Sequence, residues 1–90
     1  MEVKYILSDY LEKAMEQAIY DKLEDGTFVG IIPVCTGLIA FGNTLIETQT
    51  QLRSVLEEWV LLGLKMGHEL PVISGIDLNK KPVYESLEAL

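Results

Sequence analysis

One long helix with both ends marked in the sequence constrains this chain most strongly. Thr44 is followed three residues later by Glu47, the spacing of a capping box in which each side chain accepts a backbone hydrogen bond at the helix start. Gly67 and Pro71 mark the other end, because glycine adopts the left-handed cap and proline cannot resume the helix. The sequence therefore predicts a helix over residues 45–66, the longest element of this 90-residue chain.

The apolar residues of this helix are distributed differently along its length. Its first turns are one-sided, and we expect these residues to point inward: Leu45, Leu52, Val55, Leu56 and Trp59. From Trp59 to Leu64 the helix is apolar on nearly all sides, which so small a domain cannot cover with its own chain. Either the N-terminal helix packs over this end or a second subunit does. In the second case, the self-association surface comprises Trp59, Val60, Leu61 and Leu64.

A β-hairpin is expected ahead of the long helix. Residues 19–23 alternate apolar and polar side chains, and residues 27–32 are rich in β-branched and aromatic ones. Between them Asp25-Gly26 favours a hairpin turn, because these residues readily adopt positive φ angles.

The remaining elements complete an α+β fold in the order α-β-β-β-α-β. We expect an amphipathic helix over residues 9–17, with Ser8 or Asp9 as its cap. A third strand is expected over residues 38–41. A fourth, over residues 70–73, belongs at an edge because its proline lacks an amide donor. The simplest packing is a three- or four-stranded, mainly antiparallel sheet with both helices on one face. The opposite face must then be polar or covered.

Length and charge limit the classes of function. One domain over residues 1–74 with a tail over residues 75–90 accounts for the chain. Fourteen acidic residues against seven Lys and Arg give a net charge of −7, which repels nucleic-acid backbones and suits a basic protein partner. The longest apolar run, residues 59–64, is too short to span a membrane. With one cysteine and no leader-like segment, we expect a cytoplasmic protein.

Few residues offer chemistry. Cys35 and His68 are the only cysteine and histidine, so no intramolecular disulfide is possible and a metal site would need several carboxylates. We interpret Cys35 as a small apolar core residue and His68 as a solvated residue at a helix end. The acidic residues Asp21, Glu24 and Asp25 suit a solvated hairpin tip. We therefore expect no enzyme activity, no cofactor and no metal.

Residues 25–44 and the helix that follows them match a known pattern. It consists of an Asp-Gly turn, a strand ending in a PDLPG-type loop, a strand ending in Gly-x-Thr, and a helix with an acidic residue followed by Trp late in its sequence. The matching positions are Gly26, Pro33, Gly37, Gly42, Thr44, Glu58 and Trp59. This pattern resembles the HicB-like antitoxin family over about residues 17–73. The loop over residues 33–37 departs from it by lacking the acidic residue and the second proline.

The resemblance implies a fold and a role. It implies a partial RNase H-like domain that serves as a scaffold and not as an active nuclease. It also implies binding to a small HicA-type toxin, an mRNA-cleaving ribonuclease, within a type II toxin–antitoxin system. The chain is similar to short stand-alone members with an added N-terminal helix, because too few residues follow Pro71 for the DNA-binding domain of longer members.

Two other functions remain open. One is an orphan HicB-like homo-oligomer, a dimer or tetramer, with a purely structural role. The other is an enzyme or small-ligand-binding module, which would require Cys35 and His68 to converge.

Overall fold

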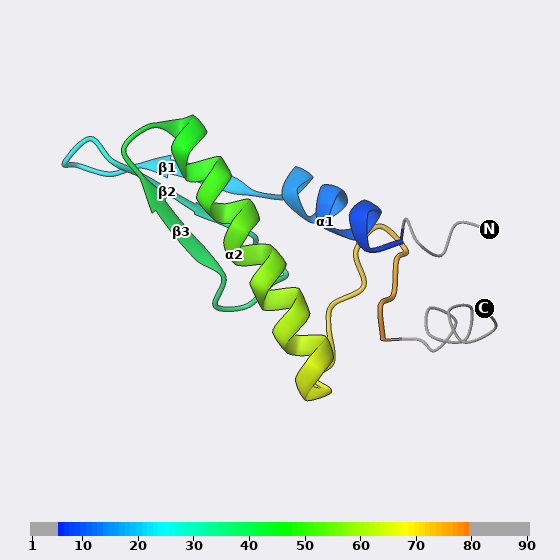
Figure 1. Ribbon diagram of the computed structural model, residues 1–90. Coiled ribbons are helices and arrows are strands. Elements are labelled where there is room, and N and C mark those ends of the chain that lie inside the picture. Colours follow the sequence, from blue (N-terminus) through cyan, green and yellow to red (C-terminus); the bar gives the residue numbers. More distant parts are fainter. Residues whose placement is uncertain (1–5, 80–90) are drawn as a thin grey trace.

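The computed structural model describes residues 6–79, which form a helix, three strands and a second helix (Figure 1). The elements are α1 (Ile6–Glu16), β1 (Ile19–Lys22), β2 (Phe28–Ile31), β3 (Ile39–Gly42) and α2 (Leu45–Met66). This arrangement confirms the α+β class and the order of the first five elements. The expected fourth strand is wrong: residues 70–73 do not join the sheet, and the segment makes one isolated bridge between Ile73 and Ile76.

The start of α2 forms as its sequence predicts. Thr44 is extended and caps the helix, and its hydroxyl oxygen accepts from the Glu47 N–H at 3.0 Å. The Glu47 carboxylate accepts from the Asn43 N–H at 2.6 Å, one residue before the cap. These two hydrogen bonds satisfy backbone N–H groups that have no acceptor within the helix.

The end of α2 is equally well defined. Gly67 has a φ of 75°, and its N–H donates to the Leu64 carbonyl at 3.3 Å. The His68 N–H reaches the Gly63 carbonyl at 2.9 Å, which completes a Schellman motif. The helix therefore covers residues 45–66, as expected.

The strands form an antiparallel sheet in the order β1-β2-β3. In the β1–β2 turn, the Leu23 N–H donates to the Thr27 carbonyl at 2.7 Å and the Gly26 N–H to the Leu23 carbonyl at 2.9 Å. Gly26 has a φ of +90°, which glycine adopts without steric cost. The hairpin thus closes with a three-residue loop over residues 24–26.

Helix α2 lies against one face of this sheet, and glycines let it approach closely. A Cβ on Gly42 would lie 2.7 Å from the Thr48 backbone nitrogen, and a Cβ on Gly30 would lie 2.8 Å from the Tyr20 ring and 3.3 Å from the Thr48 side chain. Thr48 is fully buried there, and its hydroxyl donates to the Thr44 carbonyl at 2.8 Å. Leu45, expected inward, is 41% exposed, because the helix meets the sheet one turn later.

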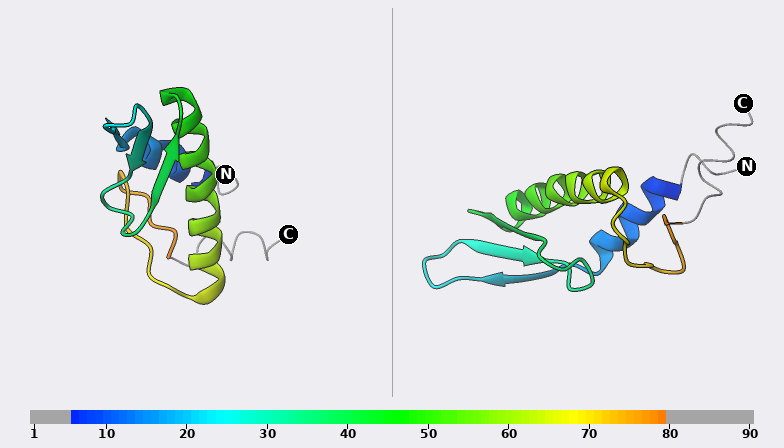
Figure 2. Two further views of the ribbon diagram at one scale, coloured as in Figure 1. Left: turned by 90° about the vertical axis from the view of Figure 1, so that its left-hand side faces the viewer. Right: turned by 90° about the horizontal axis from the view of Figure 1, so that it is seen from below.

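Helix α1 does not share the sheet face with α2, contrary to the expectation. Four-residue strands span about 13 Å, whereas the 22 residues of α2 span roughly 33 Å. The second half of α2 therefore extends past the sheet, and α1 packs there (Figure 2). Helix α1 already includes Ser8 and Asp9, so neither residue is its cap.

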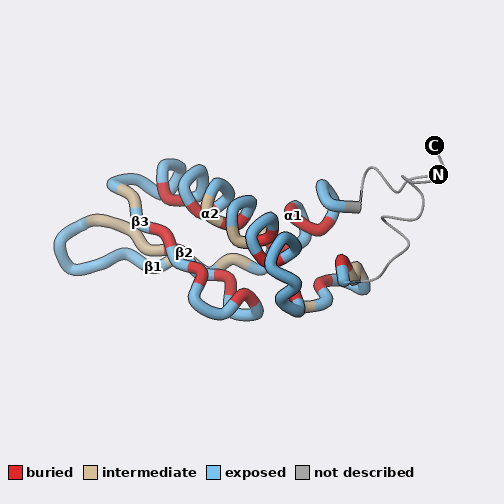
Figure 3. Tube along the Cα trace, turned by 60° about the horizontal axis from the view of Figure 1, so that its bottom comes forward, coloured by how far each residue is buried: buried red, intermediate tan, exposed pale blue. Residues whose placement is uncertain are grey.

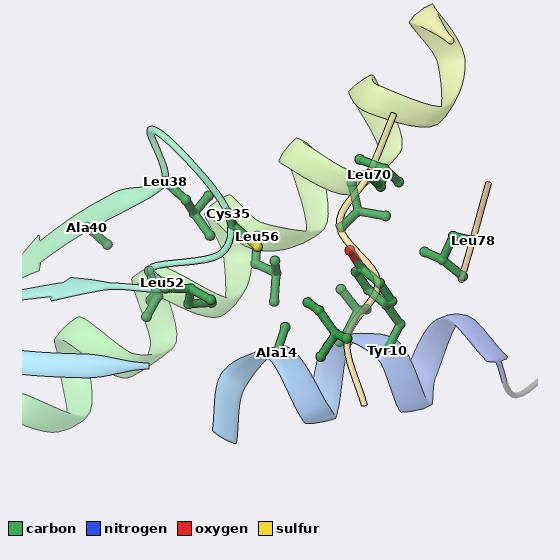
Figure 4. Close-up of a cluster of buried hydrophobic side chains, with 13 residues drawn as sticks. Tyr10, Ala14, Cys35, Leu38, Ala40, Leu52, Leu56, Leu70 and Leu78 are labelled. Carbon is green, nitrogen blue, oxygen red and sulfur yellow. The ribbon is translucent and has the colours of Figure 1, made fainter. Parts of the chain in front are cut away.

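The core joins the sheet, the loop after β2, both helices and the segment after α2 (Figure 4). Its buried apolar residues are Tyr10, Leu11, Ala14, Ile32, Cys35, Leu38, Ala40, Leu52, Leu56, Val60, Leu70, Ile73 and Leu78. The fully buried Tyr10 hydroxyl donates to the Pro71 carbonyl at 2.7 Å, and burial raises the pKa of Tyr10 to about 12. This bond attaches α1 to the segment after α2.

The packed part of the chain continues past the boundary expected at residue 74. Leu78 is buried. The Asn79 side chain makes two hydrogen bonds to the Leu70 backbone: its Oδ1 accepts from the Leu70 N–H and its Nδ2 donates to the Leu70 carbonyl, both at 2.8 Å. Residues 75–79 of the expected tail thus belong to the domain. Residues 80–90 lie outside the described part of the chain.

Replacing Gly42 by Ala tests the helix–sheet contact. The added Cβ must displace the Thr48 backbone, so Gly42→Ala should lower the free energy of unfolding by about 1–3 kcal/mol. Urea unfolding followed by circular dichroism measures it. Ser54→Ala, on the exposed side of the same helix, is the control and should change stability by less than about 0.5 kcal/mol. An unchanged midpoint for Gly42→Ala would contradict the close approach.

Replacing Tyr10 by Phe tests the attachment of α1. The substitution leaves the Pro71 carbonyl without its donor and should cost about 1–3 kcal/mol in thermal or urea unfolding. Tyr20→Phe removes the same hydroxyl from a half-buried strand position and serves as the matched control. Equal effects of the two substitutions would argue against the Tyr10–Pro71 bond.

Candidate protein-interaction surfaces

The cysteine and histidine of this chain do not form a site together. Cys35 is 1% exposed and lies in the core between β2 and β3, where burial raises the pKa of its thiol to about 11. His68 is exposed just after α2 and borders a different hollow from the one beside Cys35. Cys35 is therefore a core residue, as expected. Cys35 and His68 do not converge, so the alternative of a site built on this pair is wrong.

Of the three acidic residues expected at the hairpin tip, Asp25 stabilises the turn. The Asp25 carboxylate accepts from both the backbone N–H and the hydroxyl of Thr27, at 3.0 and 2.6 Å, and these bonds lower the pKa of Asp25. Within residues 6–79, no three His, Cys, Asp or Glu side chains gather in a way that could hold a metal ion.

The face of the sheet that α2 leaves bare is a candidate interaction surface. Alternation along each strand directs six side chains away from α2: Ile19, Asp21, Val29, Ile31, Ile39 and Phe41. We call this set the outer sheet face. Ile19 and Phe41 are each 55% exposed, Ile39 is 46% exposed and Ile31 is 38% exposed. Figure 3 shows exposed stretches of the chain within the sheet. Five of these six side chains are apolar, although they face away from the core.

The strand register arranges these side chains in two rows. Ile19, Ile31 and Ile39 are neighbours across the three strands and form one row. The second row, nearer the hairpin tip, is Asp21, Val29 and Phe41. Cross-strand neighbours of this kind lie about 5 Å apart, so each row is a continuous surface.

The residues expected to mediate self-association do not form one patch. Val60 is 1% exposed and lies in the core of the single chain, so its assignment to a surface is wrong. Trp59 is partly buried and borders a hollow with Val34 and Pro71. Helix α1 packs against α2 and covers part of this end, which is one of the two alternatives. Leu61 and Leu64 remain exposed, at 57% and 42%.

A second candidate surface lies on the uncovered side of this end of α2. Three leucines are exposed there, Leu61, Leu62 and Leu64, and Glu57 and Glu58 precede them by one turn. We call these five residues the helix ridge. Unlike the outer sheet face, the helix ridge places acidic groups beside its apolar side chains.

The family-motif positions are mostly structural. Gly26 and Gly37 have positive φ angles, Gly42 contacts Thr48, and Thr44 caps α2. Pro33 occupies the turn after β2, where the Cys35 N–H donates to the Ile32 carbonyl. Glu58 is exposed on α2, and Trp59 packs against the core. The motif therefore specifies the fold more directly than it specifies a binding surface.

Sequence analysis left open whether this second face of the sheet is polar or covered, and it did not identify the apolar residues of the outer sheet face. Its signal was the near-continuous apolar runs over residues 28–32 and 38–41. A strand with one solvated face alternates apolar and polar residues, whereas continuous apolar runs are typical of strands that are covered on both faces. These runs indicated that the second face also needs a cover.

Comparisons with known proteins place the chain in a family. The UPF0150-like family matches residues 9–71. The crystal structure of TTHA0281 from Thermus thermophilus is similar, with 34% sequence identity and a TM-score of 0.76 over 81% of this chain and 91% of that one. No curated protein matches. Across residues 6–79, neither helix is long and apolar enough to cross a membrane. The family match and the similarity to this crystal structure show that the chain belongs to the UPF0150-like family, which is related to the HicB-like antitoxins.

Proposed function

We propose that this chain is an antitoxin-like protein-binding module that neutralises a small basic toxin of the HicA type, an mRNA-cleaving ribonuclease. The helix ridge carries this proposal. Leu61 and Leu62 are 57% and 56% exposed and lie beside the exposed Leu64, and a group of exposed apolar side chains is suitable as an anchor for a partner protein. The membership in a family related to HicB-like antitoxins supports the same role.

Charge favours a basic partner at this ridge. Glu58 lies one turn before Leu61 and Leu62, the neighbouring Glu57 pairs with Arg53 at 3.3 Å, and the whole chain carries a net charge of −7. Rim charges of sign opposite to the partner's accelerate association, and the apolar centre supplies much of the affinity. The same charge disfavours direct contact with nucleic acid, so the proposed module inhibits a ribonuclease by binding the enzyme and not its RNA.

The ridge is held in place before a partner arrives. Capping bonds define both ends of α2, and Val60 and Gly63 of the same turns are buried against the core. A surface on such a helix loses little conformational freedom on binding, which favours affinity. The proposed module needs no cofactor or catalytic step, and it acts in the cytoplasm, where the single thiol stays reduced.

A homo-oligomer without a toxin is the second candidate function. The outer sheet face favours it, because five of its six side chains are apolar and a copy of the chain suffices to cover them. In that case the helix ridge has no partner and the activity depends on assembly alone.

Replacing Leu61 by Glu tests the proposed function. The wild-type chain should bind a catalytically inactive HicA-type toxin from its own host in isothermal titration calorimetry. Leu61→Glu should weaken binding at least tenfold, because it removes an apolar anchor and adds a charge at the contact. Ile46→Glu is the matched control, since Ile46 is 75% exposed at the opposite end of the same helix.

Two results would contradict the proposal. One is the absence of binding by the wild-type chain, both to the purified toxin and to any small basic protein in pulldowns from the host. The other is an equal loss of toxin binding in Leu61→Glu and Ile46→Glu, which would separate binding from the helix ridge.

A further inference from the structure

We propose that the outer sheet face binds a second copy of this chain, with Phe41 on the edge strand β3 as its main anchor. This inference goes beyond the proposed function and does not depend on a toxin. The apolar side chains of this face are exposed: Ile19 and Phe41 are each 55% exposed, whereas the residues on the other face of the same strands lie under α2. Contiguous apolar patches on monomers rarely exceed a few hundred Å² without serving as interfaces.

Charge identifies the occupant. Asp21 is the only charged residue among the six side chains of the outer sheet face. A basic toxin gains little electrostatic attraction there, whereas the helix ridge offers it acidic groups. Two copies that each carry a charge of −7 repel one another, so they meet at least electrostatic cost through a nearly uncharged surface.

The shape of the face suits a two-fold contact between copies. Phe41 stands in the row nearer the hairpin tip. Beyond the other row, a hollow opens between Ile31 and Ile39, bordered by the loop from Pro33 to Leu38. A two-fold axis in the plane of the interface, perpendicular to the strands, places each row on the opposite row of the other copy. Each Phe41 then lies over Ile39 of its partner, next to that hollow, and the contact is isologous.

The six residues of the outer sheet face are the centre of the proposed contact, which extends beyond them at both ends. Stable interfaces bury roughly 800 Å² per partner, and packed sheets lie about 10 Å apart. Leu23 at the hairpin end and Val34 in the loop are 38% and 43% exposed and extend the contact. The two-fold arrangement brings the Leu23 end of one copy to the Val34 end of the other.

Sedimentation equilibrium of charged variants tests this contact. The chain has a mass of 10.1 kDa, and the wild type should sediment with at least twice that mass at micromolar concentration. Phe41→Lys should raise the dimer dissociation constant at least 100-fold and give folded monomers. Ile19→Lys, at the opposite edge of the sheet, should act in the same direction, so the test does not depend on one variant. Both side chains are about half exposed, and circular dichroism should show that both variants fold.

Ile46→Lys is the control, because it adds the same charge at a 75% exposed position on α2 and should leave the dimer intact. Leu61→Glu should also remain a dimer, while losing toxin binding if the proposed function holds. A monomeric wild type, or Phe41→Lys and Ile19→Lys variants that still associate as dimers, would overturn the inference. So would a monomeric Leu61→Glu variant, or a sheet-face variant that loses toxin binding and nothing else.

Discussion

The close contact between α2 and one face of the three-stranded sheet is the interaction on which the rest of this structure depends. Gly30 and Gly42 leave room for Thr48, so the helix lies directly on the strands. One helix covers one face of a sheet, and a helix of roughly 33 Å extends well past strands of about 13 Å. Two regions therefore remain to be covered, the opposite sheet face and the far half of α2. Helix α1 and the segment after α2 cover only part of the second region, and no segment of residues 6–79 covers the first.

The two uncovered surfaces differ in character, and this difference supports different partners. The outer sheet face is apolar and nearly uncharged, which suits contact between two chains that carry the same net charge. The helix ridge combines exposed leucines with Glu57 and Glu58, which suits a basic protein. Because the surfaces lie on different elements, a chain that self-associates through the sheet still presents its helix ridge. On this account a dimer offers two equivalent ridges to its partners.

Elements governed by local chemistry could be predicted from the sequence, and elements governed by packing could not. The bounds of α2 follow from Thr44, Glu47 and Gly67, because capping involves neighbouring residues, and the hairpin turn follows from Asp25-Gly26 in the same way. The position of α1 depends on how far α2 extends past the end of the sheet. The burial of Val60 and the failure of residues 70–73 to join the sheet depend on that same packing. Of the two candidate surfaces, the helix ridge was predicted in part, because the sequence identified Leu61 and Leu64. The outer sheet face was indicated only by the continuous apolar runs of β2 and β3.

Hydroxyl-radical footprinting of the purified wild-type chain, read residue by residue by mass spectrometry, tests the central claim most directly. Phe41 and the leucines of the helix ridge have comparable exposure in the single chain, so an isolated monomer should be oxidised at both surfaces. The account predicts that Phe41, Ile19 and Ile39 are protected at micromolar concentration and become reactive on dilution, while Leu61 and Leu62 react equally at both concentrations. Protection of the leucines with a reactive Phe41, or no dependence on concentration at either surface, would contradict it.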